Sequence, residues 1–127
     1  MFNLLKIEGG RINVHEPEMH TVGATALARH TVCVLTNGLL VAATGATKPT
    51  HITLAAGEPG KKIATGRIES NQVYETTVAA SPASLVVGAK VQIANGTSVN
   101  ATTTDGVATI VDLLDAAASG DIIHVRF

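Results

Sequence analysis

Short apolar runs separated by turn residues are the dominant pattern along this chain. The runs are rich in Val, Ile and Thr, which suit the pleated, half-buried surface of a strand. Turn residues recur about every 8–12 positions, the spacing of a sandwich or barrel. Strands are expected at residues 4–7, 11–15, 31–36, 39–43, 51–55, 61–68, 72–79, 90–94, 98–102, 107–113 and 121–127.

Two Asn-Gly pairs between apolar runs predict β-hairpins, at Asn37-Gly38 and at Asn95-Gly96. A type I′ turn needs positive φ at both central residues, and Asn followed by Gly meets that need best.

Two other segments leave the element type open. Residues 107–118 fit helical spacing as well as a buried strand, and we expect a strand with at most one helical turn over residues 114–118. Residues 21–29 are small and weakly patterned, which fits either a loop or a short strand.

The two hairpins are related to each other. Residues 37–44 and 95–102 share the pattern N-G-x-x-V-x-A-T, 58 positions apart, and apolar positions on either side also align. The alternative is chance recurrence in a biased composition. We favour two similar β units that close around a shared core, since neither buries its apolar face alone. The fold class expected is all-β: a small β-barrel or β-tulip/sandwich with at most one or two short helices.

The amino-acid composition indicates the kind of core and argues against several classes of protein. Hydrophobic residues make up 46% of the chain but aromatic residues only 2%, so the core must be aliphatic. Cys33 is the single cysteine and lies in an apolar run, which indicates a buried, inert thiol and excludes a disulfide framework. The net charge of −1 argues against binding nucleic acid through bulk positive charge. No apolar run approaches the roughly 18 residues of a membrane span, and we expect a protein made in a reducing cytoplasm.

Catalytic signals are weak. None of the common nucleophile, phosphate-loop or zinc-protease motifs occurs, so we expect no enzyme, no catalytic residues and no cofactor. Residues 15–20 place His15, Glu18 and His20 close together in sequence, and a metal-dependent enzyme using these three is a weaker alternative. Because Pro17 favours an exposed loop there, we expect no metal site and no stoichiometric transition metal.

The second half of the chain carries a family resemblance. Its segments 74–78 (YETTV), 85–93 (LVVGAKVQI), 99–110 (VNATTTDGVATI) and 120–127 (GDIIHVRF) resemble the head decoration, or capsid cement, proteins of tailed bacteriophages and prophages. The first half is similar more loosely, at residues 32–35, 42–44, 48–54 and 60–68. The chain differs from the best-known trimeric type in length and in having no obvious Pro- or Gly-rich arm.

The resemblance implies a structural virion protein that binds the outer surface of a phage head and bridges major capsid subunits. Its expected partner is the phage major capsid protein, and it is expected to be a homo-oligomer, with a trimer favoured. It implies no direct contact with nucleic acid or membrane, and a place on the outer capsid surface after synthesis in the bacterial cytoplasm. A small β-barrel module that binds a ligand or peptide, or another joining or tail component of a virion, remains an alternative.

The N-terminal segment, residues 1–10, has two interpretations. It precedes a single β domain over residues 11–127 and ends in Gly9-Gly10, a flexible joint. As a docking arm it would contact the capsid through Met1, Phe2, Asn3, Leu4, Leu5, Lys6 and Ile7. The alternative is that residues 4–7 form the first strand of the barrel.

Overall fold

The protein is built from short strands. The structure, a computed structural model, describes residues 1–10 and 14–127, and within these ranges it contains no helix. The expected all-β class is therefore confirmed, and no described helix is long and apolar enough to cross a membrane. The strands are β1 (Asn3–Ile7), β2 (Pro17–Val22), β3 (Val32–Thr36), β4 (Leu39–Ala42), β5 (His51–Thr53), β6 (Lys62–Arg67), β7 (Gln72–Thr77), β8 (Lys90–Val91), β9 (Ile93–Ala94), β10 (Ser98–Val99), β11 (Ala108–Asp112) and β12 (Ile122–Arg126).

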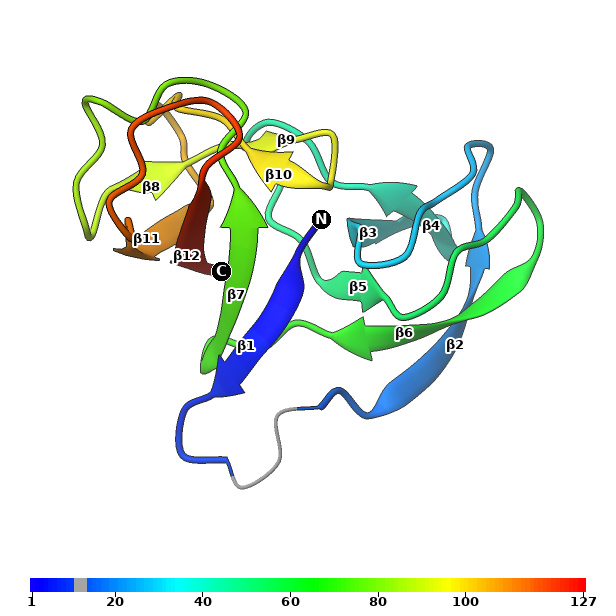
Figure 1. Cartoon of the computed structure of the whole chain (residues 1–127). Helices are drawn as coiled ribbons and strands as arrows, with labels where there is room; N and C mark the ends of the chain where they lie inside the picture. The colour runs from blue at the N-terminus through cyan, green and yellow to red at the C-terminus, as the bar shows by residue number, and fades with distance from the viewer. Residues whose placement is uncertain (11–13) are drawn as a thin grey trace.

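The first half of the chain forms a closed barrel (Figure 1). Its strand order is β2-β4-β3-β5-β6, with β6 returning to pair with β2. The β2–β4 pair is parallel and the other four pairs are antiparallel. Closure pairs the backbone groups that an edge strand would leave open.

The strands of the second half pair in the same pattern as those of the first half. Strand β7 pairs with β12, β12 with β11, and β11 with β8, all antiparallel. Strands β9 and β10 form the hairpin that corresponds to β3–β4, and a parallel bridge joins Val78 to Val99 as β2 joins β4. The two similar β units expected from the sequence are therefore present, the first spanning β2–β6 and the second β7–β12.

Both hairpins turn as their sequences predict. Asn37 and Gly38 have φ of 50° and 79°, and Asn95 and Gly96 have φ of 53° and 71°. All four residues lie in the left-handed region that a type I′ turn requires.

The two units share one apolar core. Along β3, Val32 faces outward from the barrel into the larger cluster, together with Ile52 of β5 and the buried residues of the second unit. Cys33 faces the opposite way, into a small cluster inside the barrel that also contains Val22, Leu27, Leu40 and Ile63. Because one outer face of the barrel is covered by the second unit, neither unit buries its surface alone.

The N-terminal segment is a strand of the fold. Strand β1 pairs antiparallel with β7 and crosses between the two units (Figure 1). Phe2 is fully buried, and its ring centroid lies 5.4 Å from that of Phe127. This segment is therefore a strand and not a free arm, but it pairs with β7 and is not a strand of the closed barrel.

The secondary structure differs from the sequence prediction at two places, and a third prediction falls mainly outside the described residues. Strand β2 lies where we expected an exposed loop around Pro17, so that expectation is wrong. The expected strand over residues 11–15 falls mainly on residues 11–13, which lie outside the described residues. The strand expected within 107–113 is present as β11, but residues 114–118 form no helical turn, because Leu114 and Asp115 adopt φ of 49° and 62°.

Candidate functional site

One end of the first barrel is lined by polar instead of apolar side chains. Along β2, Glu18 and His20 share the face of Val22, which belongs to the small interior cluster. His51 lies directly opposite Cys33 in the β3–β5 pair, and Arg67 lies opposite His51 in the β5–β6 pair. Directly opposed residues in antiparallel strands project to the same face, so these four polar side chains meet at the barrel mouth.

The carboxylate of Glu18 is the centre of this cluster. Its Oε2 lies 3.2 Å from Nε2 of His20 and 3.3 Å from Nε2 of His51. Its Oε1 lies 3.2 Å from a guanidinium nitrogen of Arg67. The two imidazole rings approach edge to face, with centroids 4.8 Å apart. Three strands, β2, β5 and β6, therefore supply one compact polar group.

Neighbouring threonines fix the orientation of the cluster. The hydroxyl of Thr50 lies 2.8 Å from Nδ1 of His51, which turns Nε2 of that ring toward Glu18. The hydroxyl of Thr65 donates to the backbone carbonyl of Glu18 at 3.2 Å and so ties β2 to β6 at this level. His51 is the most buried member, with 8% of its side chain exposed, against 23% for His20 and 36% for Glu18.

The electrostatics follow from burial and pairing. The pKa of Glu18 is lowered, first by the hydrogen bond with His20 and then by the charge of Arg67 and the contact with His51. Burial lowers the pKa of His51, and the neighbouring His20 lowers it further, against the raising effect of Glu18. At neutral pH the site therefore combines an ionised carboxylate with a neutral His51 imidazole.

The cluster is open to solvent on two sides. A cavity of about 700 Å³ lies beside His51 and is lined in part by Leu35, Lys48 and Thr50. A second cavity, of about 630 Å³, reaches Glu18 from the side of His15 and Asn71. Arg67 and Glu69 line both, so a small ligand can approach the barrel mouth from either direction.

The structure brings together only part of the metal-binding set that the sequence offered as an alternative. Glu18 and His20 do come together, but His15 does not join them. Its Nε2 lies 3.3 Å from the Tyr74 hydroxyl, and its ring stacks on that of Tyr74. The third member is His51, which comes from another strand. No local spacing in the sequence links it to Glu18, since only the pairing of β5 with β6 and of β6 with β2 brings it there.

The structure also shows the surroundings of Cys33 and of the N-terminal segment, which the sequence analysis singled out. Cys33 is fully buried, which confirms its predicted burial, and burial raises the pKa of its thiol to about 12. In the N-terminal segment, Met1 and Leu5 stay exposed, at 54% and 41%, whereas Phe2 is buried.

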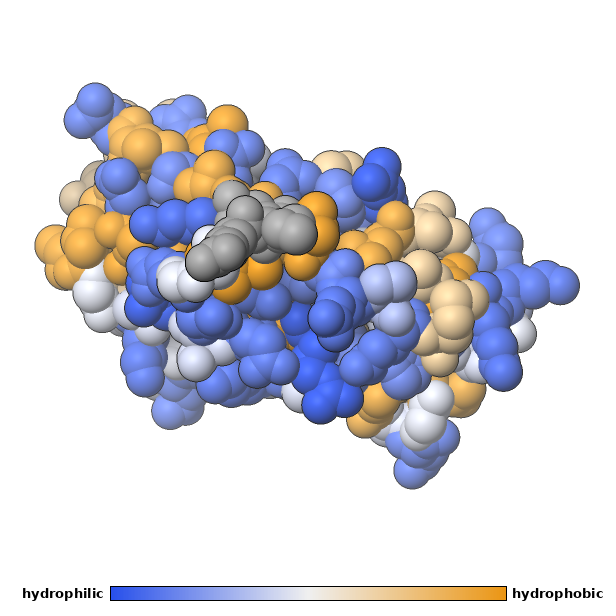
Figure 2. Space-filling model, turned by 90° about the horizontal axis from the view of Figure 1, so that it is seen from below, coloured by the Kyte–Doolittle hydropathy of each residue, from blue (hydrophilic) through white to orange (hydrophobic). Residues whose placement is uncertain are grey.

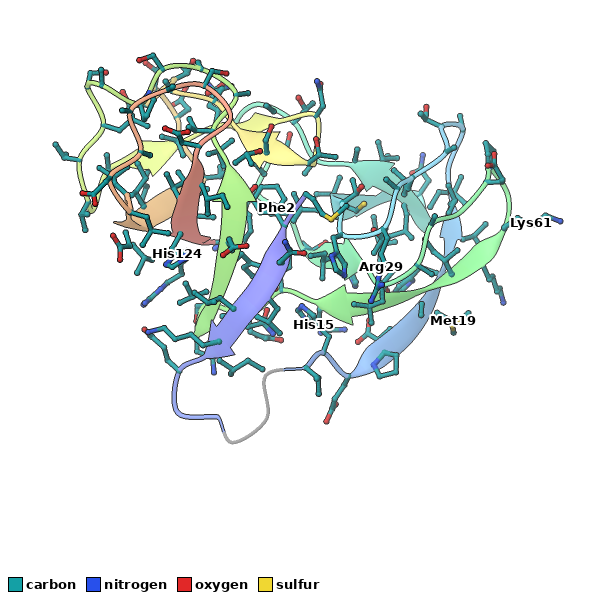
Figure 3. The ribbon with its side chains drawn as sticks, viewed as in Figure 1. Phe2, His15, Met19, Arg29, Lys61 and His124 are labelled. Atoms are coloured by element: carbon teal, nitrogen blue, oxygen red, sulfur yellow. The ribbon has the colours of Figure 1, made fainter. Side chains whose placement is uncertain are left out.

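A second surface feature lies on the outside of the first barrel. Met19, Leu39 and Val41 are 60%, 41% and 43% exposed and share the outward face of β2 and β4. We call these three residues the outer aliphatic face. Met19 projects away from the barrel in Figure 3, and Figure 2 shows hydrophobic residues toward both ends of the lower side of the molecule.

No family model matches the sequence, and a search of curated proteins finds no significant match.

Proposed function

We propose that this protein is a structural virion component that binds the outer surface of a phage head and stabilises it by bridging major capsid subunits. The outer aliphatic face carries the proposal. Its three apolar side chains stand on regular, paired strands, so a partner surface can bury them without first ordering a flexible segment. Exposed apolar residues gathered on one face are typical of a surface that meets another protein.

Bridging requires a second contact, and the second unit offers one. Val86 and Val87 are adjacent in the chain and 64% and 60% exposed. The two units are held together by the shared core, so contacts at both would link two coat subunits through a rigid body. The net charge of −1 allows many copies to crowd on a shell without strong mutual repulsion. A homo-oligomer, with a trimer favoured, would add avidity.

Co-sedimentation tests this proposal. Purified protein is mixed with expanded phage shells that lack it, and the bound fraction is measured after pelleting. We expect wild-type protein to pellet with shells and Leu39→Lys/Val41→Lys to remain in the supernatant. Ile122→Lys is the matched control, because Ile122 is an equally exposed aliphatic residue, at 45%, on β12. Wild-type protein left in the supernatant would overturn the proposal.

The N-terminal segment is tested in the same assay. Since β1 is part of the fold, its contact with a coat subunit would use Leu5 rather than Phe2. The Leu5→Lys variant should bind shells less well if residues 1–7 contribute to docking. Unchanged binding would restrict the docking surface to the two units.

A second candidate function is a small-ligand binding module. The observation that favours it is the barrel mouth, where Glu18, His20, His51 and Arg67 converge between two cavities. Apolar walls with a few convergent polar groups are the usual form of a ligand site. This function predicts that ligands will protect the protein against heat in the absence of any shell.

A further inference from the structure

The barrel mouth holds a set of side chains that nothing in the shell-binding proposal uses. Glu18, His20 and His51 offer one carboxylate oxygen and two imidazole nitrogens, and these three atoms lie within 4.8 Å of one another. The shortest separations join Glu18 Oε2 to the two Nε2 atoms, at 3.2 and 3.3 Å.

These separations match the edges of a coordination tetrahedron. Zinc binds nitrogen and oxygen ligands at about 2.0–2.2 Å, which places neighbouring ligand atoms about 3.3–3.5 Å apart. Glu18 Oε2 already stands at that distance from both imidazoles. The two Nε2 atoms then need to approach each other by no more than about 1.5 Å, within reach of small side-chain rotations.

The surroundings resemble the outer shell of a metal site. Metal-binding imidazoles usually have their second nitrogen held by a neighbouring polar group, and Thr50 is 2.8 Å from Nδ1 of His51. Arg67 contacts the other oxygen of Glu18, Oε1, and so leaves Oε2 facing the histidines. The Arg67 side chain is 62% exposed, which lets it move away from an incoming cation.

The expectation of no metal site rested on an exposed loop around Pro17, whereas this segment is strand β2. We propose instead that Glu18, His20 and His51 bind one divalent transition-metal ion of the zinc type. Two imidazoles and one carboxylate favour zinc over calcium or magnesium, which prefer oxygen ligands alone. The ion would link β2 to β5 across the barrel mouth. Three protein ligands leave a fourth position, directed to the adjoining cavities, for water or a small ligand. The proposal is independent of shell binding.

Metal titration of the full chain tests the site. Protein stripped with a chelator and dialysed is titrated with zinc chloride by calorimetry, and with cobalt chloride by visible absorption, which reports the coordination of the ion. We expect one ion per chain with micromolar or tighter affinity, together with a higher melting temperature. His20→Gln, His51→Gln and Glu18→Gln should each weaken binding by at least about tenfold.

His124→Gln is the matched control, because His124 is also a partly buried histidine beside a carboxylate, with Nε2 4.0 Å from Glu75. It should bind as wild type does. If His51→Gln fails to fold, His20→Gln carries the test, since His20 is the more exposed ligand. Three results would overturn the site: no saturable binding, equal binding by His20→Gln, or loss of binding in His15→Gln with binding kept in His51→Gln.

Discussion

The thiol of Cys33 is enclosed by the first barrel. Its side chain is fully buried, and its sulfur lies 3.5 Å from the carbonyl oxygen of Thr31. Burial disfavours the thiolate and raises the pKa to about 12, so both access and reactivity are low at neutral pH.

Cys33 should accordingly react slowly with a thiol reagent such as a chromogenic disulfide. In native buffer we expect labelling to be slow, and in denaturant it should be complete within the mixing time of an ordinary assay. The absorbance of the released thiolate measures both rates. Rapid labelling of the native protein would mean that the interior of the first barrel is not closed around this residue.

Phe2 links the N-terminus to the core. It is fully buried and packs against Phe127, which in turn lies 5.6 Å from the ring of Tyr74. An arm that only docked on a partner would leave this side chain free, whereas here it fills part of the shared core.

Phe2→Ala should therefore lower the free energy of unfolding by about 3–5 kcal/mol, the usual cost of emptying a buried aromatic site. Leu5→Ala, at an exposed position of the same strand, should change it by less than about 1 kcal/mol. Urea unfolding followed by far-UV circular dichroism gives both values. Equal effects of the two substitutions would contradict the placement of β1.

At the scale of elements, the two Asn-Gly hairpins have the same turn but different surroundings. A Cβ added to Gly38 would meet no atom within 4 Å, whereas one added to Gly96 would lie 2.8 Å from Cγ2 of Thr31 and 2.9 Å from the carbonyl oxygen of Val32. The backbone of Gly96 also accepts a hydrogen bond from the Val32 amide at 2.8 Å. The second hairpin thus packs closely on the first unit.

The variants Gly38→Ala and Gly96→Ala separate backbone strain from packing. Both place a side chain at positive φ, so each should cost about 1 kcal/mol for the backbone alone. Gly96→Ala should cost about 1–3 kcal/mol more, because the added methyl group meets Thr31 and Val32. Chemical denaturation measures the difference. Equal costs would show that the second hairpin does not press against the first unit.

Some of these elements could be predicted from the sequence and others could not. Both hairpins and the repeat were predictable, since an Asn-Gly turn needs only local backbone chemistry. Strand β2 was not predictable, because Pro17 indicated a loop. In addition, the inward-facing side chains of Glu18 and His20 are polar, so the usual alternation of apolar and polar residues along a strand is missing. The barrel-mouth cluster depends on His51, and the long-range pairing of β5 with β6 and of β6 with β2 brings it to Glu18. A local pattern carries no such information.

At the scale of the whole molecule, the shared core should make the two units unfold together. Val32 and Ile52 of the first unit lie in the same buried cluster as Tyr74 and Val125 of the second. Loss of either unit would expose the covered face of the other, and such coupling favours a single transition.

Two probes on opposite sides of this core test the coupling. Labelling of Cys33 reports the first barrel, and the fluorescence of Tyr74, the single tyrosine, reports the second unit. As urea rises, both should change with the same midpoint. Two separate midpoints would mean that the units are independent domains.

Stabilisation of a phage shell can be measured by calorimetry of the shells themselves. Expanded shells lacking the protein are heated with and without a saturating amount of it, and the temperature of the coat transition is recorded. We predict a higher transition temperature with wild-type protein and no increase with Leu39→Lys/Val41→Lys. An unchanged transition with wild-type protein that has pelleted with the shells would contradict the account, because binding would then occur without bridging.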